Sequence, residues 1–218
     1  MIFRRRDAFR LYKKSKYVKH APMAETVNES PVPDSRELSL VNAAIRVFAR
    51  YGVKRSTMAD VASEAGVTRQ TVYNCFSNKE NLVRAVIRGF AQQQLVAIYA
   101  ELADAQSVEA QLSIFLRHFF LTPQQMLQAS PHADDILEGF NAFAHDEIEE
   151  TSADAQRALA EVFEPHPSEL AKLGLTPFEL ARLVHTSARG IKLKASSSAD
   201  AEQMVRGLVR TVIAALGV

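Results

Sequence analysis

The segment from Ser56 to Phe76, STMADVASEAGVTRQTVYNCF, constrains the fold of this chain more than any other stretch. Two short amphipathic stretches flank a single glycine, Gly66, and small or apolar residues recur on one side of each. Glycine adopts the left-handed backbone conformation of a tight turn at little cost, because it has no Cβ. This spacing suits two closely packed short helices, so it predicts a helix-turn-helix.

The stretch after Gly66 indicates what the motif binds. Its residues are polar on the face opposite Val72 and Phe76, and a helix of this kind, held by a tight turn, can enter the major groove of DNA. Arg69 and Gln70 are the leading candidates for base reading, because Arg pairs with the N7/O6 edge of guanine and Gln pairs with adenine. The alternative is that both side chains are merely solvated at the start of a helix.

Further residues around the turn are candidates for DNA contacts. Ser56 and Thr57 begin the first helix of the pair, where free backbone N–H groups and the positive end of the helix dipole favour a phosphate. Thr68 and Thr71 could contact a thymine methyl group or a phosphate, although Thr68 also suits a purely structural helix cap. Asn74, one turn further along, could reach a base or a phosphate.

Composition and charge narrow the class of protein. With 47% hydrophobic residues, 8 glycines, 8 prolines and no tryptophan in 218 residues, the chain favours an all-α fold with a substantial core. Residues 36–90 carry nine basic and four acidic side chains, whereas residues 91–218 carry nine basic and seventeen acidic ones. A basic head beside an acidic remainder is typical of a DNA-binding domain joined to a separate body.

Cysteine content and hydropathy exclude some other classes. The single cysteine rules out an intrachain disulfide and a cysteine-based zinc site, and it is consistent with a cytoplasmic protein. No run of about 18 apolar residues occurs, so no membrane span is expected. The histidines lack a metal-ligand spacing such as HxxxH, and no nucleophile elbow, Walker loop or GxGxxG motif is present, so we expect neither a metal site, nor a cofactor, nor an enzyme.

Helical periodicity, caps and proline breaks predict about nine helices or slightly more. Thr57 with Asp60, and Ser77 with Glu80, have the spacing of capping boxes, which begin helices. Beyond the two short helices around Gly66, helices are expected at about residues 36–51, 78–102, 108–121, 124–129, 133–145, 146–163, 176–195 and 199–216. We therefore expect a helix-turn-helix domain over residues 36–82 and an effector-binding and dimerisation domain over residues 83–218.

Residues 1–35 form a basic leader followed by a proline-containing linker, which we expect to be disordered. Residues 1–22 have two interpretations. They could be a basic arm that follows the minor groove of DNA, or they could lie upstream of a true start at Met23.

The residues from Arg36 to about Phe90 resemble the N-terminal DNA-binding domain of TetR-family transcriptional regulators. The resemblance rests on a first helix that ends in ARYGV, on TMADVASEAGVTRQTVYNCF, and on the SNKENL that follows. It implies that the Tyr73 hydroxyl contacts a phosphate, with a half-buried ring packed on the first helix as the alternative. It also implies that Lys79 clamps a phosphate. Cys75 departs from the family pattern, in which an aromatic residue or histidine is usual.

The resemblance further implies that the last two helices pair with their two-fold mates in a homodimer. Intrachain core packing is the competing explanation for their many apolar residues, which are Phe178, Leu180, Leu183, Val184, Ile191, Val205, Leu208, Val209, Val212 and Ile213. The middle of the chain is rich in phenylalanine. A pocket for a small apolar or aromatic effector could be lined by Phe115, Phe119, Phe140 and Phe143, with ordinary core packing as the alternative.

The sequence thus predicts a sequence-specific DNA-binding transcriptional regulator. The leading interpretation is a cytoplasmic homodimeric repressor that a small-molecule effector releases from a palindromic operator. An activator, a regulator without an effector, and a helical scaffold or adaptor with a vestigial DNA-binding head are the alternatives.

Overall fold

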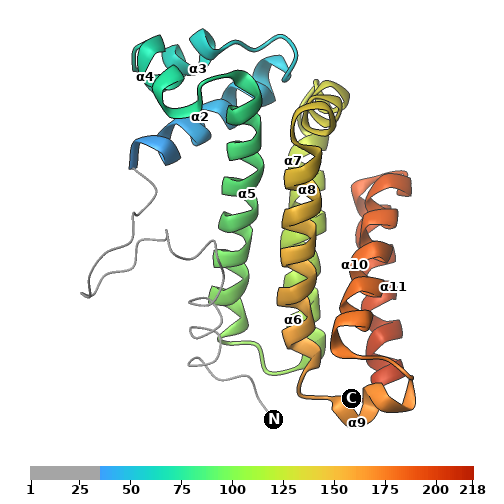
Figure 1. Ribbon diagram of the computed structural model, residues 1–218. Coiled ribbons are helices and arrows are strands. Elements are labelled where there is room, and N and C mark those ends of the chain that lie inside the picture. The colour runs from blue at the N-terminus through green and yellow to red at the C-terminus, as the bar shows by residue number, and fades with distance from the viewer. Residues whose placement is uncertain (1–34) are drawn as a thin grey trace, which may run out of the picture. The chain divides into compact units, whose positions relative to one another are not determined.

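The computed structural model describes residues 35–218, and this part of the chain is helical without a strand (Figure 1). The all-α prediction is therefore confirmed for these residues, while the leader, Met23 and the basic arm lie outside the described residues. None of the described helices is long and apolar enough to cross a membrane. The helices are α2 (Ser35–Tyr51), α3 (Met58–Ala65), α4 (Arg69–Phe76), α5 (Lys79–Leu102), α6 (Val108–Leu116), the π-helix η2 (Arg117–Leu121), α7 (Thr122–Gln128), α8 (Ala133–Phe163), α9 (Pro167–Lys172), α10 (Pro177–Lys194) and α11 (Ser198–Leu216).

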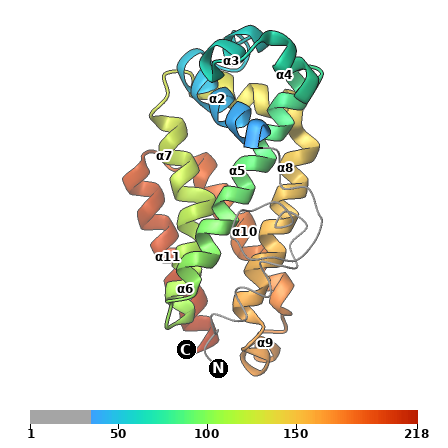
Figure 2. The ribbon, with the colours of Figure 1, turned by 90° about the vertical axis from the view of Figure 1, so that its left-hand side faces the viewer.

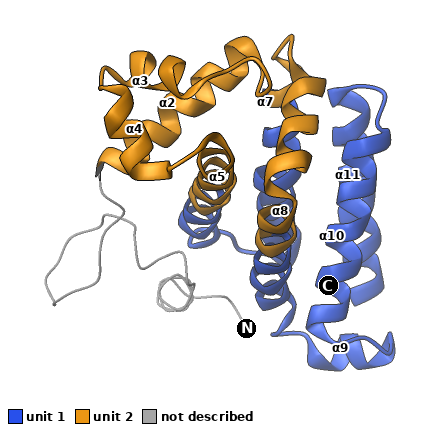
Figure 3. Ribbon diagram, turned by 45° about the horizontal axis from the view of Figure 1, so that its top comes forward, with its two compact units in different colours: residues 1–9, 94–126, 152–218 blue, residues 10–93, 127–151 orange. Residues whose placement is uncertain are grey.

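The described chain divides into two compact units, coloured separately in Figure 3. The head unit contains residues 35–93 and 127–151, and the body unit contains residues 94–126 and 152–218. The first part of α8 thus packs with the helix-turn-helix. The contiguous domains expected at residues 36–82 and 83–218 stay a prediction.

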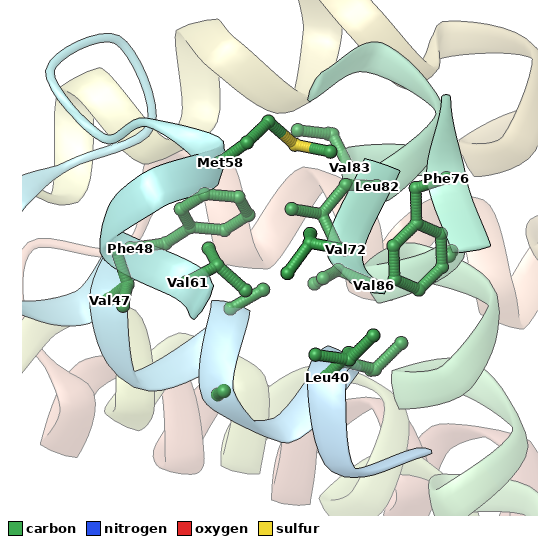
Figure 4. Packing of buried hydrophobic residues seen from close by; sticks show 14 of the residues in the cluster. Leu40, Val47, Phe48, Met58, Val61, Val72, Phe76, Leu82, Val83 and Val86 are labelled. Carbon is green, nitrogen blue, oxygen red and sulfur yellow. The ribbon is translucent and has the colours of Figure 1, made fainter. Parts of the chain in front are cut away.

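The head unit is built on one apolar cluster, seen from close by in Figure 4. Side chains from α2, α3, α4 and α5 converge there, and α8 adds Ile136 and Ala144. Each of these helices has apolar residues at helical spacing and therefore packs one face against the core. Burial of apolar surface is the main contribution to the stability of the fold. The labelled side chains that meet in Figure 4 are Leu40, Val47, Phe48, Met58, Val61, Val72, Phe76, Leu82, Val83 and Val86.

Helix termini follow local side-chain chemistry at most positions. The capping box predicted at Thr57 and Asp60 is confirmed: Thr57 Oγ1 accepts a hydrogen bond from the Asp60 N–H at 3.2 Å, and an Asp60 carboxylate oxygen accepts one from the Thr57 N–H at 2.8 Å. A second box, which joins Thr176 and Glu179, begins α10. Each box satisfies two backbone donors that the helix itself leaves free.

The capping box predicted at Ser77 and Glu80 is wrong. Ser77 ends α4, with φ of 57°, and its N–H donates to the Tyr73 carbonyl. Asn78 provides the cap instead, because its Oδ1 accepts the Asn81 N–H at 2.8 Å. Glu80 pairs with Arg84 one turn later.

Residues 133–163 form one helix, although two were expected. The expected break survives as a kink at Ala144, where φ is −141° and ψ is 30°. The Phe143 carbonyl, next to the kink, accepts a hydrogen bond from Arg84 Nε at 3.2 Å. A partner outside the helix therefore satisfies a carbonyl close to the irregular backbone.

The helices around Pro123 are also more continuous than expected. The π-helix η2 joins α6 directly to α7, so Pro123 lies in the first turn of α7, where proline is tolerated. A short helix, α9, follows His166 in a stretch for which no helix was expected. Within the body unit, α10 and α11 contact each other (Figure 1).

Candidate nucleic-acid interface

The turn between α3 and α4 has the geometry of a helix-turn-helix. Gly66 is left-handed, with φ of 67° and ψ of 31°, and its N–H donates to the Ser63 carbonyl at 3.2 Å. The Val67 N–H donates to the Ala62 carbonyl at 2.9 Å. These bonds form a Schellman closure, which satisfies the last carbonyls of α3 and aims α4 away from it. Figures 1 and 2 show the two helices joined by this turn.

The helix α4 is divided into a buried and an exposed side. Val72 and Phe76 enter the core of the head unit, whereas the ring of Tyr73 is 47% exposed. Tyr73 thus has about half of its surface open to solvent, and its phosphate contact stays a prediction. Of the predicted contact residues in and just before α4, only Thr71 is partly buried, and the exposed ones are Thr68, Arg69, Gln70, Tyr73 and Asn74.

The exposed polar side chains of α4 are held in order by local hydrogen bonds. Gln70 Nε2 donates to Asn74 Oδ1 at 2.7 Å, across one helical turn. The hydroxyl oxygens of Thr68 and Thr71 lie 2.9 Å apart, and Thr68 Oγ1 also accepts the Thr71 N–H at 3.2 Å. Thr68 is therefore the structural cap of α4, so its hydroxyl is already engaged in the free protein.

The start of α3 and the start of α5 come together at one edge of the head unit. Ser56 is buried, and its hydroxyl donates to the Gly52 carbonyl. Only the backbone N–H of Ser56 therefore remains a candidate for a DNA contact. Thr57 is exposed. Lys79 Nζ donates to the Lys54 carbonyl at 3.1 Å, which brings the first residue of α5 beside the chain that leads into α3. Burial lowers the pKa of Lys79, while the carboxylates of Asp135 and Asp60 oppose that shift.

Charge on the motif is arranged so that the face of α4 stays free of acids. No acidic residue occurs in α4 itself. Glu64 of α3 is paired with Arg46 at 2.6 Å and with Arg50 at 3.4 Å, and the hydrogen bond from Arg46 holds the pKa of Glu64 below its usual range. Asp60 is occupied by its capping box, and the hydrogen bonds from Thr57 lower its pKa. An anionic ligand would therefore meet little local repulsion at α4.

A contact that sequence reasoning missed joins α8 to the loop before α3. Asp135 Oδ2 accepts the Lys54 N–H at 3.0 Å, and Lys54 Nζ forms an ion pair with Glu138. Val53 packs so closely on Gly139 that a Cβ at residue 139 would lie 2.5 Å from Val53 Cβ. The only local signal was a glycine inside a helical pattern, which often marks a close approach.

The phenylalanines predicted to line an effector pocket belong to different units. Phe140 and Phe143 pack against the core of the head unit. Phe115 and Phe119 stack in the body unit with ring centroids 5.2 Å apart, and Phe115 is fully buried. The body unit has a cleft of about 290 Å³, but it is lined by other residues, among them Gln106, His166 and Ile213. The pocket therefore stays a prediction.

The helices α10 and α11 contain both core and exposed apolar residues. Half of the apolar residues listed for the predicted dimer interface are buried within the chain, namely Leu180, Val184, Val205, Val209 and Val212. The large apolar side chains that remain exposed on these helices are Phe178, Leu183, Leu193 and Met204, with exposed fractions of 43%, 57%, 75% and 43%.

An exposed polar helix, placed by a glycine turn on a buried multi-helix core, defines the class of helix-turn-helix DNA-binding proteins. A family model described as bacterial regulatory proteins of the tetR family matches residues 40–86. Those residues are thus similar to the DNA-binding domain of that family, and the match covers this part of the chain only.

Curated relatives match the chain over part of its length. The HTH-type transcriptional regulator TtgR of Pseudomonas putida is 48% identical over 48 residues, 22% of this chain and 23% of that protein. The HTH-type nicotine-responsive transcriptional repressor HdnoR of Paenarthrobacter nicotinovorans is 35% identical over 75 residues, 34% of this chain and 39% of that protein. The matches therefore span less than half the length of these relatives.

Solved structures extend the likeness to the fold of the whole described chain. A transcriptional regulator from Cytophaga hutchinsonii aligns with a TM-score of 0.64 and 20% identity, covering 84% of this chain and 98% of that one. A TetR-family transcriptional regulator from Rhodococcus sp. aligns with a TM-score of 0.62 and 18% identity, covering 83% and 100%. Outside residues 40–86 the likeness to these two structures is therefore one of fold.

Proposed function

We propose that this protein is a cytoplasmic transcriptional repressor that binds a palindromic operator as a homodimer and leaves it when a small effector binds. The observation that carries the proposal is the exposed, acid-free face of α4 beyond the Gly66 turn. Arg69 and Gln70 read bases in the major groove, and Asn74 supports Gln70 through their hydrogen bond. Thr71 and Thr68 flank these contacts.

Phosphates are held around this face and set the register of the protein on DNA. The Tyr73 hydroxyl, the exposed start of α3 at Thr57, the backbone N–H of Ser56 and the ammonium group of Lys79 take this part. The proposal is tested by selecting duplexes from a random-sequence pool and footprinting the enriched duplexes. Enrichment of a two-fold symmetric sequence supports it, whereas weak, salt-labile binding without enrichment is the outcome expected of a scaffold with a vestigial head.

Replacing Arg69 with alanine is expected to lower affinity for the selected duplex by roughly 5- to 150-fold per half-site, because a bidentate base contact contributes about 1–3 kcal/mol. Affinity for a mixed-sequence duplex should fall much less. Fluorescence anisotropy on both duplexes measures the two effects. Arg55→Ala is the matched control, because Arg55 is also exposed and its replacement removes the same positive charge. It should weaken both duplexes alike, and equal losses for Arg69→Ala would contradict base reading.

The homodimer part of the proposal rests on the exposed apolar residues of α10 and α11. A two-fold axis beside these helices would bury the exposed apolar residues of one protomer against the same residues of its partner. Leu183→Glu is then expected to weaken dimerisation by at least roughly thirtyfold, because a buried unpaired carboxylate costs about 2 kcal/mol or more. Sedimentation velocity measures the change. Met126→Glu, an equally apolar exposed site on α7, is the control. A wild-type protein that stays monomeric would refute the dimer.

The effector part extends what the name of one relative says, since HdnoR is called nicotine-responsive. A small apolar or aromatic molecule bound in the body unit would shift the protein between states of different DNA affinity. A thermal-shift screen of small apolar compounds tests this part, because a ligand at about 100 times its Kd raises stability by about 2.7 kcal/mol. A stabilising compound that also weakens binding to the selected duplex supports repression relieved by an effector. Stabilisation without any change in DNA affinity contradicts it.

A further inference from the structure

The loop from Gly52 to Lys54 is docked on the first turns of α8. A Cβ at Gly52 would lie 2.2 Å from Asp135 Oδ2, and a Cβ at Gly139 would lie 2.5 Å from Val53 Cγ1. Contacts this close require glycine on both sides. The loop therefore packs tightly on α8 at these two glycines, and the side chain of Lys54 projects from this packed segment.

The backbone of Lys54 is held from two directions. Its N–H donates to Asp135 at 3.0 Å, and its carbonyl accepts from Lys79 Nζ at 3.1 Å. Lys54 thus lies between the start of α5 and the chain that enters α3 at Thr57. This is the edge of the head unit that the proposed function assigns to DNA phosphates.

The ammonium group of Lys54 is paired with the carboxylate of Glu138. The hydrogen bond and the charge of Glu138 raise the pKa of Lys54, so the lysine stays positive over the whole physiological range. Both side chains are largely exposed, 59% for Lys54 and 64% for Glu138. An exposed pair is weak and easily exchanged, so another anion can displace Glu138 from Lys54.

From this geometry we propose that Glu138 acts as an internal substitute for a DNA phosphate on Lys54. In the free protein the carboxylate occupies the lysine, and DNA binding exchanges it for a phosphate at the same edge. Asp135 is the positioning residue, because it holds the backbone from which Lys54 projects. Because the ion pair with Glu138 has to be broken first, the affinity for DNA of any sequence is lower. Glu138 therefore limits non-specific binding. This inference rests on the proposed DNA-binding function.

The test measures affinity for a mixed-sequence DNA duplex by fluorescence anisotropy at several KCl concentrations. Glu138→Gln keeps the length and a hydrogen-bond acceptor but removes the charge. It is expected to raise affinity about two- to fivefold at low salt, the range that an exposed ion pair covers. The gain should shrink as KCl rises, because screening weakens the competing pair.

Two further variants separate exchange on Lys54 from a general change of charge. Asp134→Asn is the matched control, because Asp134 is exposed on the same helix and has no ion pair within residues 35–218. The change in affinity for Asp134→Asn should be at most about a fifth of the gain expected for Glu138→Gln. In a Lys54→Gln background, Glu138→Gln should have no effect, since the group for which carboxylate and phosphate compete is gone.

Several results would overturn the inference: no gain for Glu138→Gln, an equal gain for Asp134→Asn, or a gain that persists in the Lys54→Gln background. Circular dichroism and the thermal midpoint check that each variant is folded. The mixed-sequence duplex keeps this test apart from the proposed function. Failure to select any operator would refute sequence-specific regulation, whereas the coupling between Glu138 and Lys54 is measured without an operator.

Discussion

Phe48→Ala is expected to destabilise the head unit by about 3–5 kcal/mol, the usual cost of removing a buried phenylalanine side chain. Phe48 is 2% exposed in the cluster of Figure 4, which also contains side chains from α3 and α5. A single domain is stable by only about 5–15 kcal/mol. The variant should therefore lose much of the free energy of unfolding that keeps α4 packed on its core. Its DNA affinity should fall although no contact residue has changed.

Hydrogen exchange resolves where this loss occurs, because it reports opening free energies segment by segment. Protection should fall in α2, α3 and α4 together, since they share one core. Tyr51→Ala is the matched control, as Tyr51 lies in the same helix and is 46% exposed. It should change stability by less than about 1 kcal/mol. A similar loss for both variants would mean that the cluster around Phe48 is not the main source of stability in the head unit.

Gly52→Ala is expected to destabilise the head unit by about 2–4 kcal/mol, from two separate causes. Gly52 has φ of 80°, and an L-residue in a left-handed conformation costs about 1–2 kcal/mol. The new Cβ would also lie 2.2 Å from Asp135 Oδ2 and 2.9 Å from Asp135 Cγ, so the carboxylate has to move and gives up the Lys54 N–H. The loss of that hydrogen bond leaves a backbone donor without its partner.

Gly66→Ala separates the two causes. Gly66 is left-handed as well, with φ of 67°, but nothing lies within 4 Å of the position of its Cβ. It should cost only the conformational part, about 1–2 kcal/mol. Chemical denaturation of both variants gives the comparison, and Asp135→Ala should recover part of the loss in Gly52→Ala but none in Gly66→Ala. Equal costs for the two glycines would show that the contact with Asp135 contributes nothing.

The features of the DNA-binding motif that were predictable are those that depend on neighbouring residues. Gly66 has to be left-handed for two short helices to turn sharply, and Thr57 with Asp60 satisfies backbone donors three residues apart. The polar side of α4 follows from the spacing of Val72 and Phe76. Because these signals are local, the helix-turn-helix and its exposed face could be recognised without knowing what packs behind them.

Competition between adjacent local signals was harder to resolve. Ser77 and Asn78 both have side chains that cap helices, and only the path of the chain out of α4 decides that Asn78 is the cap of α5. Near Ala144 a new helix was expected from residue 146, but the backbone only kinks, with Arg84 hydrogen-bonded to the Phe143 carbonyl. In such places the tertiary contact outweighs a preference of about 1 kcal/mol or less.

Local chemistry alone placed the recognition helix, its turn and its candidate base-reading residues, because caps, turns and amphipathic spacing act within a few residues. Packing between distant parts of the chain decided the rest. Asp135, Glu138 and Gly139 reach the loop before α3 from a helix about 80 residues away in the chain, and no local pattern indicates which surface they meet. Phe140 and Phe143 join the head core for the same reason, since an apolar side chain is buried wherever the fold provides a partner surface.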